Sequence, residues 1–344
     1  MKTLIVLILV ATIAPAQTTH VRDVVSAAAK LLRERYVDPA IGDTLSAELE
    51  KKLRGGEYNG ISGAELAETL TSDLQKIHPD KHLRITYSAT PAVPRGSQSE
   101  PSSEGRRARI TQLGGEINYG FRDAEILRGN IGYLAIDGFW HLEFGGGDTA
   151  AAAMHFLANT DALIIDLRES VHGGDPEMAL LIASYFFPEQ VHLSDFYSRP
   201  TNEMRQWWTL AWVPGQRYLN KPLFLLTSAK TLSAGEGFAY DLQSQKRATI
   251  VGEKTAGAAH PEEEYALTPN FTIELPFARS INAVTKTDWE GIGAIPDIPT
   301  SASSALDVAH LRALEAVLHN SASSRLTEER NAALTGLRKR LSTK

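Results

Sequence analysis

The first part of the chain carries apolar residues at the spacing of amphipathic helices. Between positions 18 and 82, valine, leucine and isoleucine side chains return every three or four residues, which is the period that places them on one face of a helix. The pair Gly55-Gly56 predicts a helix end inside this region. Residues 83–87 then alternate between apolar and polar side chains, so we expect a strand directly after His82.

The pattern changes after a stretch rich in proline, serine and glycine at 88–107. Beyond it, short apolar runs typical of buried strands alternate with amphipathic stretches, and this alternation predicts an α/β domain. We expect strands at 131–136, 162–167, 222–227 and 248–251, and helices at 148–159, 176–187 and 233–244. Residues 268–283 alternate like an antiparallel hairpin.

The start of the chain has the organisation of a secretory signal peptide. Lys2 provides a positive charge, residues 4–13 form an apolar run, and Ala14-Pro15-Ala16 offers a small-residue cleavage site. The alternative is a membrane anchor, but the run is too short to span a bilayer comfortably. We therefore expect a secreted or periplasmic protein with no integral membrane span after signal removal.

These patterns divide the chain into five expected segments. They are a signal peptide at 1–16, an N-terminal helical domain at 17–87, a linker or mobile loop at 88–108, an α/β domain at 109–302 and C-terminal helices at 303–344.

Composition narrows the chemistry. The formal net charge of -6 argues against a nucleic-acid partner, which normally meets a basic surplus. The absence of cysteine excludes disulfides, thiolate nucleophiles and cysteine-bound zinc. The histidines are scattered and form no H-E-x-x-H motif, so we expect neither a metal nor a cofactor.

Ser233 stands where a buried strand runs through a short polar turn into a helix. Together with Glu236 it forms a capping-box pattern, in which the hydroxyl merely satisfies a backbone N–H. The same position also suits a nucleophile, because a helix N-terminus stabilises an alkoxide and the oxyanion that it creates. The N–H of Ala234 is then a candidate oxyanion donor. From this pattern alone both interpretations stay open.

A second strand end carries a charged pair and a glycine turn. Asp166 and Arg168 close the strand at 162–167, and Gly173-Gly174 precede the next helix. Ligands of open α/β sheets bind beyond the carboxyl ends of the strands, where a glycine turn can point an N–H into a cleft. We interpret Asp166 and Arg168 as supporting residues, a structural charge pair rather than catalysts.

Two further polar residues, His82 and Glu290, lie in loops where the neighbouring residues constrain the path of the backbone. His82 separates a helix from a strand, and Glu290 lies in a segment with two glycines and a Pro-Asp pair. Taken singly, each is also compatible with an ordinary solvated side chain.

Read together, these segments resemble the C-terminal-processing peptidase family, the tail-specific proteases. They are closest to its branch with the tricorn core and the interphotoreceptor retinoid-binding protein modules. The motifs are Asp80-Lys-His82-Leu, Ile165-Asp-Leu-Arg168 with Gly173-Gly174, Thr231-Leu-Ser233-Ala-Gly-Glu236, Val251-Gly-Glu-Lys-Thr-Ala-Gly257 and Trp289-Glu-Gly-Ile-Gly-Ala-Ile-Pro-Asp297. Their order and approximate spacing match those of the family.

The resemblance implies a crotonase-like α/β core of stacked sheet and helices with an N-terminal helical domain. It implies Ser233 as the nucleophile, with Ala234 and a glycine of Gly173-Gly174 as oxyanion donors. The processing peptidases carry their base lysine where this chain has Ala258, so a Ser–Lys dyad of that kind is not expected.

The tricorn branch instead implies a triad. His82 and Glu290 match its histidine and glutamate, although Lys81 stands where that branch has a serine. The expected base is then an imidazole, oriented by a carboxylate.

The resemblance thus implies an exported serine peptidase that cleaves peptides or proteins through a Ser-His-Glu triad. The alternative is a non-proteolytic binding module on the same fold, holding apolar, retinoid-like or lipid-like ligands or peptides. The aromatic stretch from Asp195 to Trp212 would suit such a pocket, although a packed lid or a core strand explains it slightly better. The family's PDZ module does not fit between Tyr87 and Ile131, and the oligomeric state is left open.

Overall fold

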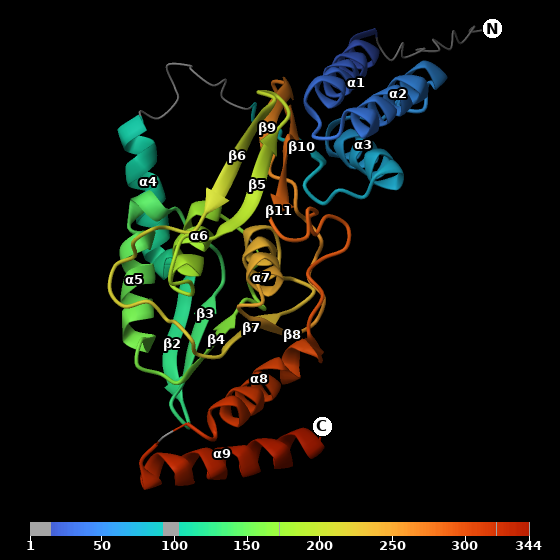
Figure 1. Ribbon diagram of the computed structural model, residues 1–344. Helices are drawn as coiled ribbons and strands as arrows, with labels where there is room; N and C mark the ends of the chain where they lie inside the picture. The colour runs from blue at the N-terminus through green and yellow to red at the C-terminus, as the bar shows by residue number, and fades with distance from the viewer. Residues whose placement is uncertain (1–14, 92–102, 172, 321, 344) are drawn as a thin grey trace, which may run out of the picture. The chain divides into compact units, whose positions relative to one another are not determined.

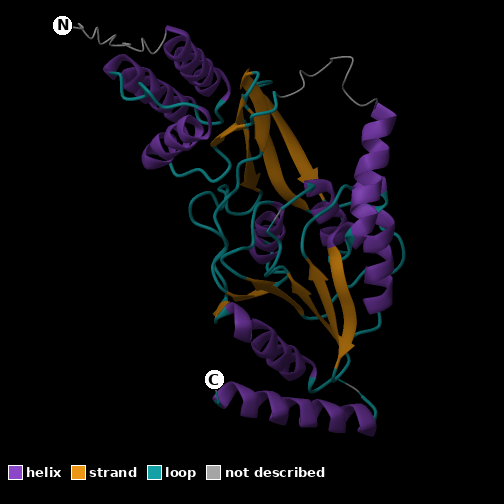
Figure 2. Ribbon diagram, turned by 180° about the vertical axis from the view of Figure 1, so that it is seen from behind, coloured by secondary structure: helices purple, strands orange, loops and turns teal. Residues whose placement is uncertain are grey.

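The computed structural model describes residues 15–91, 103–171, 173–320 and 322–343, which form two compact units (Figures 1 and 2). The signal peptide predicted at 1–16 lies almost entirely outside these residues. Among them, no helix combines the length and the apolar character needed to cross a membrane.

The first unit combines the N-terminal helices with a small sheet. Its helices are α1 (Pro15–Arg35), α2 (Pro39–Gly55) and α3 (Gly63–Ile77), and its strands β1 (Arg84–Tyr87), β9 (Glu262–Thr268) and β10 (Phe271–Pro276) pair in the order β1-β10-β9. Asp38 caps α2 by accepting the N–H groups of Ala40 and Ile41, at 2.9 and 3.1 Å. The helix end expected at Gly55-Gly56 is present, with Gly56 left-handed at φ 75°.

One hydrophobic core holds this unit together. The apolar faces of the three helices meet Leu83 and Ile85 beside β1 and Phe271 and Ile273 of β10. The helical pattern at 18–82 is confirmed, but the unit also recruits strands from far along the chain, so it is not helical alone.

The second unit is built on a mixed six-stranded sheet, counted over its described residues. Its strands are β2 (Phe121–Leu127), β3 (Ile131–Ile136), β4 (Ala162–Asp166), β7 (Leu223–Thr227), β8 (Thr249–Gly252) and β12 (Ile298–Pro299), in the order β12-β8-β7-β4-β3-β2. The pairs from β3 to β12 are parallel, and β2 runs antiparallel to β3 at the edge. The predicted α/β class is confirmed.

Helices cover both faces of this sheet, which explains why β3, β4 and β7 are buried along their whole length. Alternate residues such as Leu163 and Ile165 pack under α5 (Gly146–Leu157), α6 (Pro176–Ser184) and α7 (Ala234–Ser244). The residues between them, such as Ile164, pack under α8 (Ala302–Val317) and α9 (Ser324–Ser342) on the other face (Figure 1).

The last helix is tied to the sheet by a buried arginine. Arg330 of α9 is 1% exposed and donates to the carbonyl oxygens of Gly129 and Val317 and to the carboxylate of Asp161. These bonds satisfy the guanidinium, which would otherwise be costly to bury.

Two local expectations differ from the structure. The helix α4 (Ser103–Glu116) begins inside the stretch expected as a linker at 88–108. The hairpin predicted over 268–283 is wrong, because β10 pairs with β1 and β9, whereas β11 (Ala278–Asn282) pairs with β5 (His192–Ser198). The alternation is real, but Pro276 divides it between two sheets. The strand β6 (Glu203–Trp208) completes the sheet of β11 and β5.

Candidate active site

Ser233 lies on a sharp turn between β7 and α7, at the carboxyl edge of the parallel strands. Its backbone has φ 53° and ψ −117°, a region that residues with a side chain rarely adopt. The turn is anchored beneath Ser233, because the Thr231 hydroxyl donates to Leu167 O at 2.8 Å and Leu232 N donates to Ser170 O at 3.0 Å. The strained position is therefore held by the neighbouring loop after β4.

Gly173 approaches Ser233 so closely that only glycine fits. A Cβ atom on Gly173 would lie 2.5 Å from Ser233 Cβ and 3.0 Å from its hydroxyl oxygen, and its φ is 59°. Gly174, with φ 119°, is packed equally tightly against the carbonyl of Phe139. In the described part of the chain, the N–H groups of Gly173 and Ala234 have no hydrogen-bond acceptor. Both are thus available beside the serine hydroxyl.

Glu236 ties this turn to the loop after β8. Its buried carboxylate accepts four hydrogen bonds, from Ser233 N at 3.0 Å, Thr255 Oγ1 at 2.5 Å, Gly257 N at 2.6 Å and Ala258 N at 2.9 Å. Burial raises the pKa of Glu236, and the four hydrogen bonds oppose that rise. The capping box expected at Ser233 and Glu236 is present, and Glu236 also serves the loop 255–258.

Asp166 and Arg168 form a charge pair at the end of β4. The guanidinium donates two bonds to the carboxylate, Nη2 to Oδ2 at 2.6 Å and Nε to Oδ1 at 2.9 Å, and Tyr133 donates a third at 2.7 Å. Burial alone would raise the pKa of Asp166, but the bonds from Arg168 and Tyr133 outweigh it and lower that pKa. Arg168 also donates to Ala302 O at the start of α8, at 2.6 Å. The charge pair thus links the end of β4 to α8.

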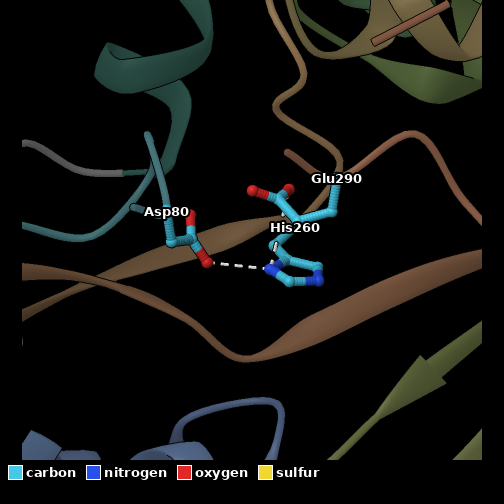
Figure 3. A group of neighbouring side chains, drawn as sticks. All are labelled: Asp80, His260 and Glu290. Atoms are coloured by element: carbon cyan, nitrogen blue, oxygen red, sulfur yellow. Dashed lines mark hydrogen bonds and ion pairs between the residues drawn. The ribbon is translucent and has the colours of Figure 1, made fainter. Parts of the chain in front are cut away.

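Three other titratable side chains converge nearby (Figure 3). His260 Nδ1 lies 2.8 Å from Asp80 Oδ2 and 3.7 Å from Glu290 Oε2. Glu290 Oε2 accepts the Ala259 N–H at 2.6 Å, whereas its other oxygen, Oε1, is buried without a hydrogen-bond partner in the described structure. Asp80 Oδ1 accepts the backbone N–H of His82 at 3.0 Å.

The charges of this trio shift each other's titration. Burial lowers the pKa of His260, but Asp80 first, and then Glu290 and Asp288, outweigh burial and raise it. Burial, with the charge of Asp80, raises the pKa of Glu290 to about 7, although His260 opposes the rise. His260 thus favours the imidazolium form, and Glu290 titrates near neutrality.

The same three residues each bring one potential metal-ligand atom within 4.8 Å of the others. The Nδ1–Oδ2 separation of 2.8 Å is that of a hydrogen bond, so we interpret the group as a proton-sharing network.

The structure brings together four of the predicted site residues: Ser233, Ala234, Gly173 and Glu236. It places His82 beside Asp80, and it places Glu290 beside His260. The Ser233 hydroxyl makes no hydrogen bond to His82 among the described residues, and the ion pair of Glu290 is with His260. The sequence reading missed His260 and gave Asp80 no role. The sequence offers only weak signals for these two residues. Asp80 begins the motif that contains His82, and His260 lies two positions after Ala258, where the processing peptidases carry their base lysine.

A cavity of about 1110 Å³ opens next to the glycine turn. Gly174 and Phe139 contribute to its wall, together with Trp140, Phe144 and Glu177. The wall therefore combines aromatic side chains with acidic ones.

Comparisons with known proteins agree on one family. A model described as peptidase family S41 matches residues 130–300, and one described as the N-terminal domain of Peptidase_S41 in eukaryotic IRBP matches residues 11–112. A carboxyl-terminal-processing protease of Synechocystis sp. is 28% identical over 170 residues, which are 49% of this chain and 37% of the protease. The chain thus spans little more than a third of that relative.

Solved structures share the fold at low identity. A putative peptidase from Parabacteroides merdae aligns with a TM-score of 0.55 at 18% identity, over 82% of this chain and 90% of that one. Mature CPAF, solved with lactacystin, aligns with a TM-score of 0.61 at 12% identity, over 95% of this chain and 99% of that one.

Proposed function

Because the chain belongs to peptidase family S41, we propose that it is a serine peptidase whose nucleophile is Ser233. The observation that carries the proposal is the strained turn at Ser233, with φ 53°, pressed against Gly173 at the start of α7. Strain of this kind persists only where the surroundings enforce it, and it is characteristic of functional positions. A residue that merely capped a helix would not need it.

The proposed reaction is that of an activated serine. Ser233 Oγ attacks the carbonyl carbon of a peptide bond while His82 accepts its proton, and the same imidazole then protonates the leaving amine. The N–H groups of Ala234 and Gly173 stabilise the oxyanion, aided by the positive end of α7. Water, activated by His82, hydrolyses the resulting acyl-enzyme. Glu290 supplies the carboxylate that stabilises the imidazolium. We propose the crotonase-like arrangement as the core that presents these groups.

We propose that the substrate is a peptide or protein segment that enters in extended form. The cavity that Gly174 helps to line contains the aromatic side chains of Phe139, Trp140 and Phe144, which suit an apolar side chain of the substrate. The signal-peptide pattern supports a secreted or periplasmic location. The similarity to a carboxyl-terminal-processing protease of Synechocystis sp. supports cleavage near the carboxyl ends of proteins.

The alternative is a binding module for apolar ligands. The aromatic side chains in the cavity wall and the match to an IRBP N-terminal domain favour it. Such a module would have no use for a strained serine with free N–H groups beside it, so we place the peptidase first.

The test is labelling of the mature protein with a fluorophosphonate probe. We expect labelling at Ser233 that is abolished by Ser233→Ala and greatly weakened by His82→Ala. Ser244→Ala, at the other end of the same helix, is the matched control and should label like the wild type. Folded wild-type protein that stays unlabelled, yet binds a fluorescent fatty acid in the cavity, would favour the binding module.

A further inference from the structure

We propose that His260 is a positioning residue, a cation held between Asp80 and Glu290 that fixes the His82 segment and keeps Glu290 available as a carboxylate. This inference rests on the proposed peptidase function. It assigns a role to a histidine outside the predicted triad.

The first link runs from His260 through Asp80 to His82. The Asp80 side chain is fully buried, and its two oxygens serve different partners: Oδ2 accepts the His260 ring N–H at 2.8 Å, and Oδ1 accepts the His82 backbone N–H at 3.0 Å. Movement of His260 would therefore be transmitted through one rigid carboxylate to the backbone of the proposed base.

The second link runs from His260 to Glu290. The imidazole Nδ1 is 3.7 Å from Glu290 Oε2, too far for a hydrogen bond but close enough for strong attraction in a buried site. Among the described residues, the Glu290 carboxylate accepts one hydrogen bond, from Ala259 N to Oε2, and its Oε1 accepts none. The positive charge of His260 is thus the main attraction that favours the ionised form of Glu290.

The loop that carries His260 contacts the other segments of the site. Gly257 and Ala258 donate to Glu236 beneath Ser233, Ala259 donates to Glu290, and Ala256 O accepts the Lys81 ammonium at 2.5 Å. Successive positions of one loop therefore hold the serine turn, the glutamate and the histidine segment. Within the segment 256–260, His260 is the residue with a titratable side chain.

The groups facing Glu290 predict the direction of its titration. Asp80 and Asp288 raise its pKa, and His260 lowers it. Asp288 in turn is paired with Arg279 at 2.7 Å and accepts the Glu290 backbone N–H at 3.1 Å. Removing the positive charge of His260 must therefore raise the pKa of Glu290, and removing the negative charge of Asp288 must lower it.

Two substitutions at His260 separate its two roles. Glutamine can still donate to Asp80 but carries no charge, so His260→Gln should move the acidic limb of the kcat profile to higher pH by about one unit, with kcat recovering at high pH. Alanine loses the hydrogen bond as well, so His260→Ala should also lower the maximal kcat roughly tenfold or more, with KM unchanged. Added imidazole should restore part of that loss.

Asp288→Asn is the matched control with the opposite sign. Asparagine keeps an oxygen to accept the Glu290 N–H, and the loss of negative charge should move the acidic limb to lower pH. The proposal is overturned if the acidic limb of the kcat profile stays at the same pH in both His260→Gln and Asp288→Asn. It is also overturned if the limb moves in the same direction in both variants.

A readout without catalysis keeps the inference separate from the proposed function. In a long-range ¹H–¹⁵N spectrum of the wild type, the His260 signal, assigned by its disappearance in His260→Gln, should show a protonated Nδ1. That ring should lose its charge at a higher pH than an exposed histidine does, and Asp80→Asn should reverse the shift. An unprotonated Nδ1 at pH 6 would refute the His260–Asp80 link even if Ser233 is labelled. Failure of Ser233 labelling would refute the peptidase and leave this measurement intact.

Discussion

Two glutamates of the site, one buried and one nearly so, are held in opposite ways. Glu236 accepts four hydrogen bonds, from the serine turn and from the loop 255–258. Within the described structure, Glu290 accepts one from a backbone N–H and has one carboxylate oxygen without a partner. Burial raises the pKa of both. The difference teaches that similar burial does not mean similar function: a carboxylate with all its hydrogen bonds made holds the structure, and one with an oxygen left over can exchange a proton.

The largest expected effect is at Glu236. Replacing it with alanine removes the acceptor of four buried donors, so Glu236→Ala should lower the free energy of unfolding by at least about 3 kcal/mol. Urea denaturation monitored by tryptophan fluorescence measures this loss. A loss below about 1 kcal/mol would mean that the donors find water or new partners, and that Glu236 is not the scaffold.

A smaller loss is expected when only one of these donors is removed. The Thr255 hydroxyl donates to Glu236 at 2.5 Å and accepts the Ala294 N–H at 2.7 Å. Thr255→Val has nearly the same shape without either bond, so it should cost about 2 kcal/mol in the same urea experiment. Because both residues belong to one network, the effects of Thr255→Val and Glu236→Ala should be clearly non-additive in the double variant. Additive effects would break the proposed link between the serine turn and the loop.

The smallest effect, and one of opposite sign, is expected at Glu290. Its pKa in the folded protein is about 7 against a usual 4.5, so its ionisation destabilises the fold. That cost is absent below about pH 4.5, grows as the pH rises towards 7, and is complete above it. Glu290→Gln should therefore leave stability unchanged at pH 4 and raise it by about 1–2 kcal/mol at pH 8. If Glu290→Gln is less stable than the wild type at pH 8, Glu290 stabilises the fold as Glu236 does.

The sequence predicted the scaffold better than the site. The strands at 131–136 and 162–167 were readable because they are buried on both faces and hence continuously apolar. The helix at Ser233 was readable because its capping box is local. The pairing of His260 with Asp80 joins residues 180 positions apart, and no local pattern reports such a contact.

The hairpin error has the same origin. Alternation shows that residues 268–283 are extended, but it does not say which strand lies alongside. The partners of β10 and β11 come from sheets assembled by the whole fold, so pairing depended on information outside the segment. Likewise, the positive φ of Ser233 has no signature in the residue type, since serine usually avoids that conformation.

The buried guanidinium of Arg330 has a practical consequence for anyone shortening the protein. Arg330 pairs with Asp161 and donates to the carbonyl of Gly129 in the β2–β3 turn. Deletion of α9 would therefore leave these groups of the sheet without this hydrogen-bond partner. Expression clones should therefore keep the chain through α9 and attach any purification tag beyond it.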